Sequence, residues 1–184
     1  SSDLHWRTSK PIDYADSPLT TTDATESRFT AGPRPGATAR NVCVNPDAQR
    51  RSWLFDAFAP GFQVLVFGDH AATLRQAAED IASLRAERIP VRLLSIQRGS
   101  GSSVAAADAQ VLDPLARIHE AWGAGPGAVY VLRPDQHVAA RWTFDATTRV
   151  GAVIRKALGR ALASAPATTP EPSEALADRK STRL

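Results

Sequence analysis

Methionine is absent from this sequence of 184 residues, and cysteine occurs only once, as Cys43. A single thiol excludes an internal disulfide framework, a C-x-x-C redox pair and a cysteine-rich zinc site. This usage fits a reducing compartment, so we expect a cytoplasmic location. The chain begins at Ser1 without an initiator methionine, and no apolar signal segment follows. We interpret it as a processed protein or, as we favour, a piece of a longer one.

Long apolar runs are also missing. The longest blocks, such as residues 64–67, have the length of a strand and fall far short of the roughly 18 residues that span a bilayer. We therefore expect no membrane insertion. Lys and Arg number 22 against 19 Asp and Glu, a net charge of +3, but they are scattered and form no recognition motif. The sequence therefore predicts no nucleic-acid partner.

Residues 1–40 are rich in proline, serine and threonine and have little periodicity, which predicts an extended arm. The arm contains Tyr14, Leu19 and Phe29 at intervals. We expect them to act as apolar anchors that hold the arm, as a strap, over a neighbouring surface. A disordered linker is the alternative that composition leaves open. Residues 164–184, rich in Ala, Pro, Thr and Glu, predict a disordered tail.

Residues 41–163 form the predicted domain. After a short strand at 41–44, the pattern from Phe62 onward reads strand, helix, strand, helix, hairpin, helix. The expected strands cover 62–67, 91–96, 128–132 and 137–142. The first expected helix covers 71–88, and the second is capped by Asp113-Pro114 and has Leu115, Ile118 and Trp122 on one side. The last expected helix has an apolar stripe of Val150, Val153, Ile154, Ala157, Leu158 and Leu162. Two β-α-β crossovers followed by a hairpin give a mixed α/β sheet flanked by helices, which is the core of the thioredoxin-like fold.

Redox-active members of that fold carry a cysteine pair where the first core strand meets its helix. Here this position reads Phe67-Gly68-Asp69-His70-Ala71-Ala72 and has no thiol, so disulfide exchange at this site is excluded. We interpret Cys43 as a buried structural thiol rather than a nucleophile. His70 caps the helix in our interpretation, with catalysis as the less favoured alternative.

Other chemistry-bearing residues give weak signals. The four histidines, His5, His70, His119 and His137, have no metal-ligand spacing. The serines within 99–103 lack the context of a nucleophile elbow. The glycine-rich run 123–127 precedes a strand rather than a helix, so we read it as a tight turn and not as a phosphate loop. We therefore assign no catalytic, cofactor-binding or metal-binding residue in this chain.

Several segments together resemble the C-terminal domain of the FAD-dependent aromatic-ring hydroxylases, the phenol-hydroxylase-like flavoprotein monooxygenases. The most telling is the run 131–142, where the family shows an R-P-D-G-x-V-A-x-R-W hairpin and this chain has Gln136 in place of the glycine. The other carriers are Ser17-Pro18-Leu19, Pro35-Gly36-Ala37, Leu54-Phe55, Gly61-Phe62, Leu65-Val66-Phe67-Gly68 and Gly123-Ala124-Gly125-Pro126-Gly127-Ala128.

The resemblance implies a non-catalytic accessory domain that serves packing or dimerisation behind an upstream FAD and substrate module, with residues 1–40 as the arm leading from it. FAD and NAD(P)H are implied for the parent enzyme, an aromatic monooxygenase, and none for this chain, which lacks G-x-G-x-x-G. Gly68-Asp69 looks like the family's flavin-binding Gly-Asp motif, but no Rossmann strand precedes it, and we judge it accidental.

Two other readings remain. The chain could be a free-standing thioredoxin-like module that binds a ligand or a partner. It could also be a free-standing enzyme that uses Cys43 or His70.

Overall fold

The computed structural model describes residues 12–22, 26–29, 31–45, 49, 51–99, 105–143 and 147–160. The predicted tail at 164–184 and Leu162 lie outside these residues. The five strands are β1 (Phe62–Phe67), β2 (Val91–Gln97), β3 (Ala109–Leu112), β4 (Val129–Leu132) and β5 (Val138–Trp142). The helices are α1 (Ala71–Ala86), α2 (Arg117–Trp122) and α3 (Val150–Ala157), with short 3-10 turns at Glu26–Arg28 and Leu54–Ala57.

The sheet has the order β3-β2-β1-β4-β5. Strands β1, β2 and β3 run parallel, whereas β4 is antiparallel to β1 and β5 is antiparallel to β4. The β1-α1-β2 crossover followed by the β4–β5 hairpin and α3 is a thioredoxin-like arrangement, so the predicted fold class is confirmed. The second predicted β-α-β crossover is wrong, because the strand after α2 runs antiparallel to β1 and lies on the other side of it from β2. No helix in the described part of the chain is long and apolar enough to cross a membrane.

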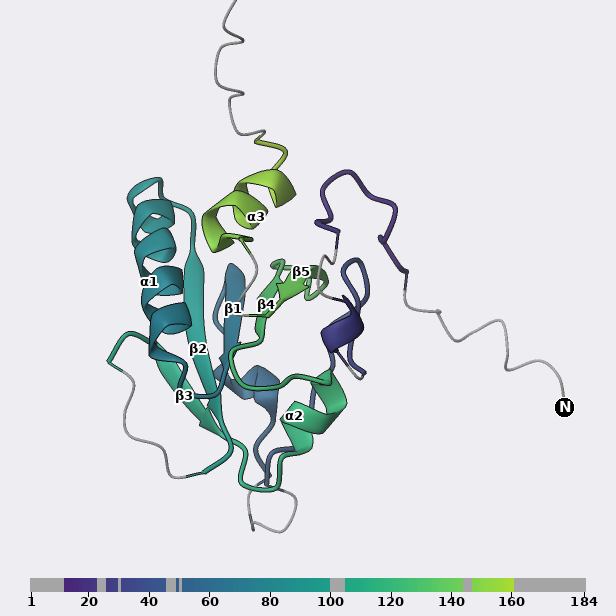
Figure 1. Cartoon of the computed structure of the whole chain (residues 1–184), viewed down its shortest axis with the longest axis vertical. Helices are drawn as coiled ribbons and strands as arrows, with labels where there is room; N and C mark the ends of the chain where they lie inside the picture. The colour runs from purple at the N-terminus through teal and green to yellow at the C-terminus, as the bar shows by residue number, and fades with distance from the viewer. Residues whose placement is uncertain are drawn as a thin grey trace, which may run out of the picture.

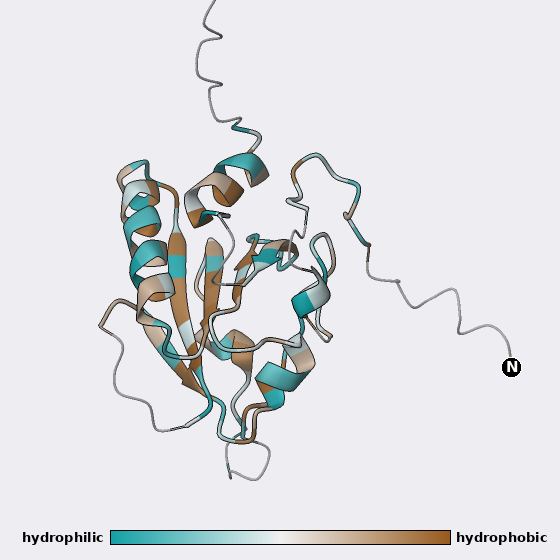
Figure 2. Cartoon of the chain, viewed as in Figure 1, coloured by the Kyte–Doolittle hydropathy of each residue, from teal (hydrophilic) through white to brown (hydrophobic). Residues whose placement is uncertain are grey.

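Two hydrophobic layers sandwich the sheet (Figure 1). On one face, α1 and α3 pack through Leu74, Ile81 and Ile154. On the other face, α2 and segments of the N-terminal arm pack against Leu65, Phe67 and Tyr130. Figure 2 shows the strands coloured as hydrophobic while the outer side of α1 is hydrophilic. Since helices or arm cover both faces, every residue of β1, β4 and β5 is buried.

The first crossover follows the sequence pattern closely. His70 caps α1, because its Nδ1 accepts a hydrogen bond from the backbone N–H of Thr73 at 3.3 Å. The apolar stripe of α1 faces the sheet. The helix ends before Arg88, which adopts a left-handed φ of 62°, and Pro90 leads into β2.

Several local predictions are wrong. Residues 41–44 form no strand, and only an isolated bridge joins Cys43 to Trp53. Strand β3 was not predicted, because four residues at a sheet edge give too short a pattern. Helix α2 begins four residues after Asp113, and this leaves Leu115 54% exposed.

The C-terminal predictions also need correction. Residues 137–142 alternate in a way that predicts a half-buried strand, but β5 is buried on both faces, because the arm covers the face that alternation assigns to solvent. In the last helix, Val150, Val153 and Ile154 are buried as predicted, but Leu158 follows the end of α3 and is 42% exposed.

Candidate functional site

The strand-to-helix junction of β1 and α1 is where redox-active relatives of this fold hold their thiols. Here Gly68 takes a φ of +82° at the end of β1, and Asp69 is exposed. The Nδ1 of His70 is engaged in capping, 2.8 Å from the Thr73 hydroxyl. Gly68 and Asp69 thus lie between β1 and α1, within the thioredoxin-like arrangement.

The other singled-out residues are dispersed. Cys43 is only partly buried, so the expectation of a buried thiol is wrong. Its backbone pairs with that of Trp53, far from His70 in the chain. His5 lies outside the described residues. Among the described residues, no three His, Cys, Asp or Glu side chains are grouped so that they could hold a metal ion.

The N-terminal arm is laid along the open edge of β5. The backbone N–H of Gly36 donates to the carbonyl of Val138 at 2.8 Å, and the N–H of Val138 donates back to Ala37 at 2.9 Å. Further along the same strand, the N–H of Thr21 donates to Ala139 at 2.9 Å. The arm therefore satisfies backbone groups that an edge strand would otherwise expose.

Phe29 is the apolar anchor of this arm. It is 9% exposed and packs edge-on against Tyr130, with ring centroids 5.5 Å apart. The buried guanidinium of Arg141 lies over the Phe29 ring at 4.5 Å and donates from Nη1 to the carbonyls of Ala31 and Pro33. The Arg141 side chain of β5 thus holds the arm against the sheet. The alternating pattern of the strand did not predict this contact.

The two other predicted anchors bind less deeply. Tyr14 is 37% exposed and packs edge-on against His137. Leu19 is 36% exposed and makes no part of the core. The strap prediction therefore holds for the Phe29 region, where the surface that the arm covers is the domain's own sheet.

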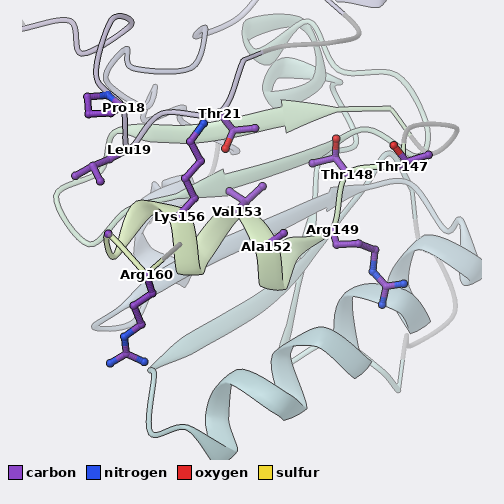
Figure 3. Close-up of a pocket in the computed structure, with 11 residues that line it drawn as sticks. Pro18, Leu19, Thr21, Thr147, Thr148, Arg149, Ala152, Val153, Lys156 and Arg160 are labelled. Atoms are coloured by element: carbon purple, nitrogen blue, oxygen red, sulfur yellow. The ribbon is translucent and has the colours of Figure 1, made fainter. Parts of the chain in front are cut away.

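Leu19 instead borders a groove between the arm and α3, with a volume of about 580 Å³ (Figure 3). Pro18, Ala152 and Val153 add apolar surface to it. Figure 3 shows Lys156 rising from α3 toward Thr21 on the arm, while Arg149 and Arg160 turn away. The Oγ1 of Thr21 is buried here and has no hydrogen-bond partner in the part of the chain that the structure describes.

The carboxylates of Asp80 on α1 and of Glu87, directly after α1, bind the arginines beside this groove. Arg149 donates to Asp80 at 2.6 Å, and this hydrogen bond raises the pKa of the Arg149 guanidinium. The hydrogen bond from Arg155 to Glu87 likewise raises the pKa of Arg155, and Arg160 lies 3.7 Å from Glu87. Lys156 has no ion-pair partner among the residues that the structure describes, so its charge is available to a neighbour.

The described residues that line the groove include no cysteine, serine or histidine and no carboxylate, so they provide no paired acid and base. Its chemistry is that of an interface: apolar surface, one unengaged ammonium and threonine hydroxyls at the border. The sequence did not predict this groove, because the arm and α3 are separated by more than a hundred residues and the pattern does not show that they meet.

No protein-family model matches this chain, and no curated protein matches it. Among solved structures, it is similar to aklavinone-11 hydroxylase in a ternary complex with FAD and aklavinone. The identity is 28%, the TM-score is 0.55, and the match covers 82% of this chain and 26% of that one.

Two further structures are similar at lower identity. The flavin-dependent monooxygenase PieE, in complex with FAD and substrate, is 19% identical with a TM-score of 0.52, over 77% of this chain and 24% of that one. Peroxidoxin BcpB from Mycobacterium tuberculosis is 17% identical with a TM-score of 0.45, over 70% of this chain and 96% of that one. The chain thus spans about a quarter of the length of the two hydroxylase chains.

Proposed function

We propose that this chain is the C-terminal accessory domain of a cytoplasmic, FAD- and NAD(P)H-dependent aromatic hydroxylase. The observation that carries the proposal is the similarity to aklavinone-11 hydroxylase, which extends over 82% of this chain but only 26% of that enzyme. In this proposal the flavin, the nicotinamide and the aromatic substrate bind to a preceding module. This chain acts through its surface.

The groove between the arm and α3 is the surface that we assign to that module. The groove combines apolar side chains with the ammonium of Lys156, which has no ion-pair partner among the described residues. This combination suits a partner surface that carries an apolar ridge with an acidic side chain beside it. The arm itself is the connection to the preceding module, and Phe29 and Arg141 fix its last part against the sheet. A second copy of the chain is the competing occupant of the groove.

The first test is the reading frame that precedes Ser1. The proposal requires a G-x-G-x-x-G segment between a strand and a helix there. A frame that encodes no dinucleotide-binding module would reject the accessory role.

The second test uses the whole enzyme that this frame encodes. We expect Lys156→Glu and Val153→Asp to weaken packing between the modules, so that thermal unfolding splits into two transitions and FAD retention falls. Arg75→Glu, an exposed change on α1 outside the groove, is the control and leaves both unchanged. Loss of a dimer in sedimentation, with FAD retention intact, would assign the groove to self-association instead.

A further inference from the structure

A second cavity, of about 360 Å³, opens where β1 and β2 end. Its lining is more polar than that of the groove between the arm and α3. Gly68, Gln97 and Pro126 form part of its wall, and Asp69 and Arg98 border it. His119 of α2 also lines it, although this residue is only 2% exposed. The cavity is therefore of a size that admits a ring-sized molecule.

His119 belongs to a buried dyad with Asp113. The His119 Nδ1 lies 2.8 Å from Oδ2 of Asp113, and both side chains are almost fully buried. The same Oδ2 accepts the backbone N–H groups of Ile118 at 2.9 Å and His119 at 3.0 Å. Since this oxygen acts as an acceptor, Nδ1 must be the donor. In the neutral ring the lone pair is then on Nε2.

The dyad does more than capping alone requires. The Asp113 carboxylate already satisfies two backbone N–H groups at the start of α2, and it could do this without an imidazole beside it. The Phe67 and His119 rings pack edge to face, with centroids 5.2 Å apart, and this contact fixes the plane of the imidazole. Nε2 has no hydrogen-bond partner among the described residues, and it lies on the ring edge away from Asp113.

The second oxygen of Asp113 supports the same interpretation. Oδ1 is buried and has no hydrogen-bond partner among the described residues, where the carboxylate accepts all its hydrogen bonds through Oδ2, one of them from the imidazole. Buried polar groups are nearly always satisfied, so an unsatisfied carboxylate oxygen requires an explanation. The orientation of an imidazole that lines a cavity is one that fits this geometry.

We propose that this cavity binds an uncharged, ring-sized molecule whose O–H or N–H group donates a hydrogen bond to Nε2 of His119. Asp69 and Arg98 at the border have opposite charges, so the border favours neither anions nor cations. Asp113 acts as a positioning residue that holds the imidazole in the accepting tautomer. The proposal goes beyond the accessory role and does not rest on it.

The test compares phenol with anisole, which has the same ring but no donor. Both are titrated into the whole chain at pH 8, where an ordinary histidine is neutral, and binding is followed by NMR of histidine ring nitrogens and of the Gly68, Gly99 and His119 amides. We expect phenol to bind at least fivefold more tightly than anisole. We also expect the His119 Nε2 resonance, unprotonated at the start, to move with phenol only.

Variants assign the effect to the dyad. His119→Ala should abolish the preference for phenol, and His119→Gln should restore part of it through its amide oxygen. Arg75→Ala, an exposed change on α1 outside this cavity, is the control and leaves the preference unchanged. Equal binding of phenol and anisole by the natural chain, or a protonated Nε2 in its neutral ring, overturns the proposal even if the His119 variants do not fold.

Discussion

The carboxylate of Asp80 on α1 caps α3, because its Oδ2 accepts the backbone N–H of Gly151 at 3.1 Å. The residue at the N-cap position, Arg149, provides no side-chain cap of its own. Instead, Arg149 donates two hydrogen bonds to the same carboxylate, from Nε at 3.1 Å and from Nη2 at 2.6 Å. One acidic side chain therefore joins the two helices that cover one face of the sheet.

This junction makes the stability of the domain depend on pH. Burial raises the pKa of Asp80, but the hydrogen bonds from Arg149 and Gly151 outweigh it, so the pKa lies below its ordinary value. A lowered carboxyl pKa stabilises the folded state above the ordinary value of about 4. The stabilisation is lost as the pH falls through the lowered folded value.

We therefore expect Asp80→Asn to reduce the free energy of unfolding by about 1 kcal/mol at pH 7, the usual scale of a lost cap. At an acidic pH below that lowered folded value the difference from the natural chain should shrink, because Asp80 has then lost its charge in both states. Denaturant unfolding at both pH values measures this. Glu120→Gln, on the exposed side of α2, should have little effect at either pH; a pH-independent loss in Asp80→Asn would contradict the linkage.

At Gly32 the arm lies directly against the end of α2. This glycine has a φ of +93°, and a Cβ there would collide with the backbone carbonyl of Trp122 and the Tyr130 hydroxyl. We expect Gly32→Ala to lower stability by at least about 2 kcal/mol, because both the strained φ and the rigid carbonyl oppose a side chain. The arm should also become more sensitive to limited proteolysis.

Gly125 provides the matched control, because a Cβ there would meet nothing within 4 Å and its φ is not in the left-handed region. Gly125→Ala should leave the melting temperature within about 1 °C of that of the natural chain, since surface changes of this kind are small. If the two alanine variants melted alike, the arm would not be held against α2 as described.

Much of the sheet could be predicted from local patterns. The continuous apolar run of β1 and the helical stripe of α1 are long, and their pattern needs no tertiary information. The cap at His70 could also be predicted, since the residue stands directly before the first helical turn. These elements together define the crossover that identifies the fold.

The candidate sites required contacts that no local pattern contains. Arg141 alternates like a solvent-facing residue, yet the arm buries it beneath Phe29. Asp113 and His119 are six residues apart, and a helix starting at Asp113 would have placed them on no common face. The left-handed φ of Ala116 delays α2 and turns the imidazole back toward the carboxylate.

Gln136 occupies the position where the resembling family has glycine, and its φ is +65°. Its N–H closes the hairpin turn by donating to Arg133 at 2.9 Å. A left-handed conformation costs a residue with a Cβ about 1 kcal/mol relative to glycine. We expect Gln136→Gly to raise the free energy of unfolding by roughly 0.5–1 kcal/mol, whereas Gln136→Ala should not. Chemical denaturation of both variants decides; a loss of stability in Gln136→Gly would show that the side chain matters more than the backbone.

Trp142 ends β5 and is 4% exposed, opposite Val129 on β4 and within the core that α1 and α3 cover. Its removal leaves a large cavity, so we expect Trp142→Ala to cost roughly 3–5 kcal/mol. That is a large fraction of the stability of a domain of this size, about 5–15 kcal/mol, and some of the chain should then be unfolded at 37 °C. Leu158→Ala is the control: Leu158 is 42% exposed beyond the end of α3, so its loss should cost less than about 1 kcal/mol. Thermal melts followed by circular dichroism compare the two. An unchanged melting temperature in Trp142→Ala would mean that β5 does not pair with β4 in this register, because a shift by one residue turns the indole to the opposite face.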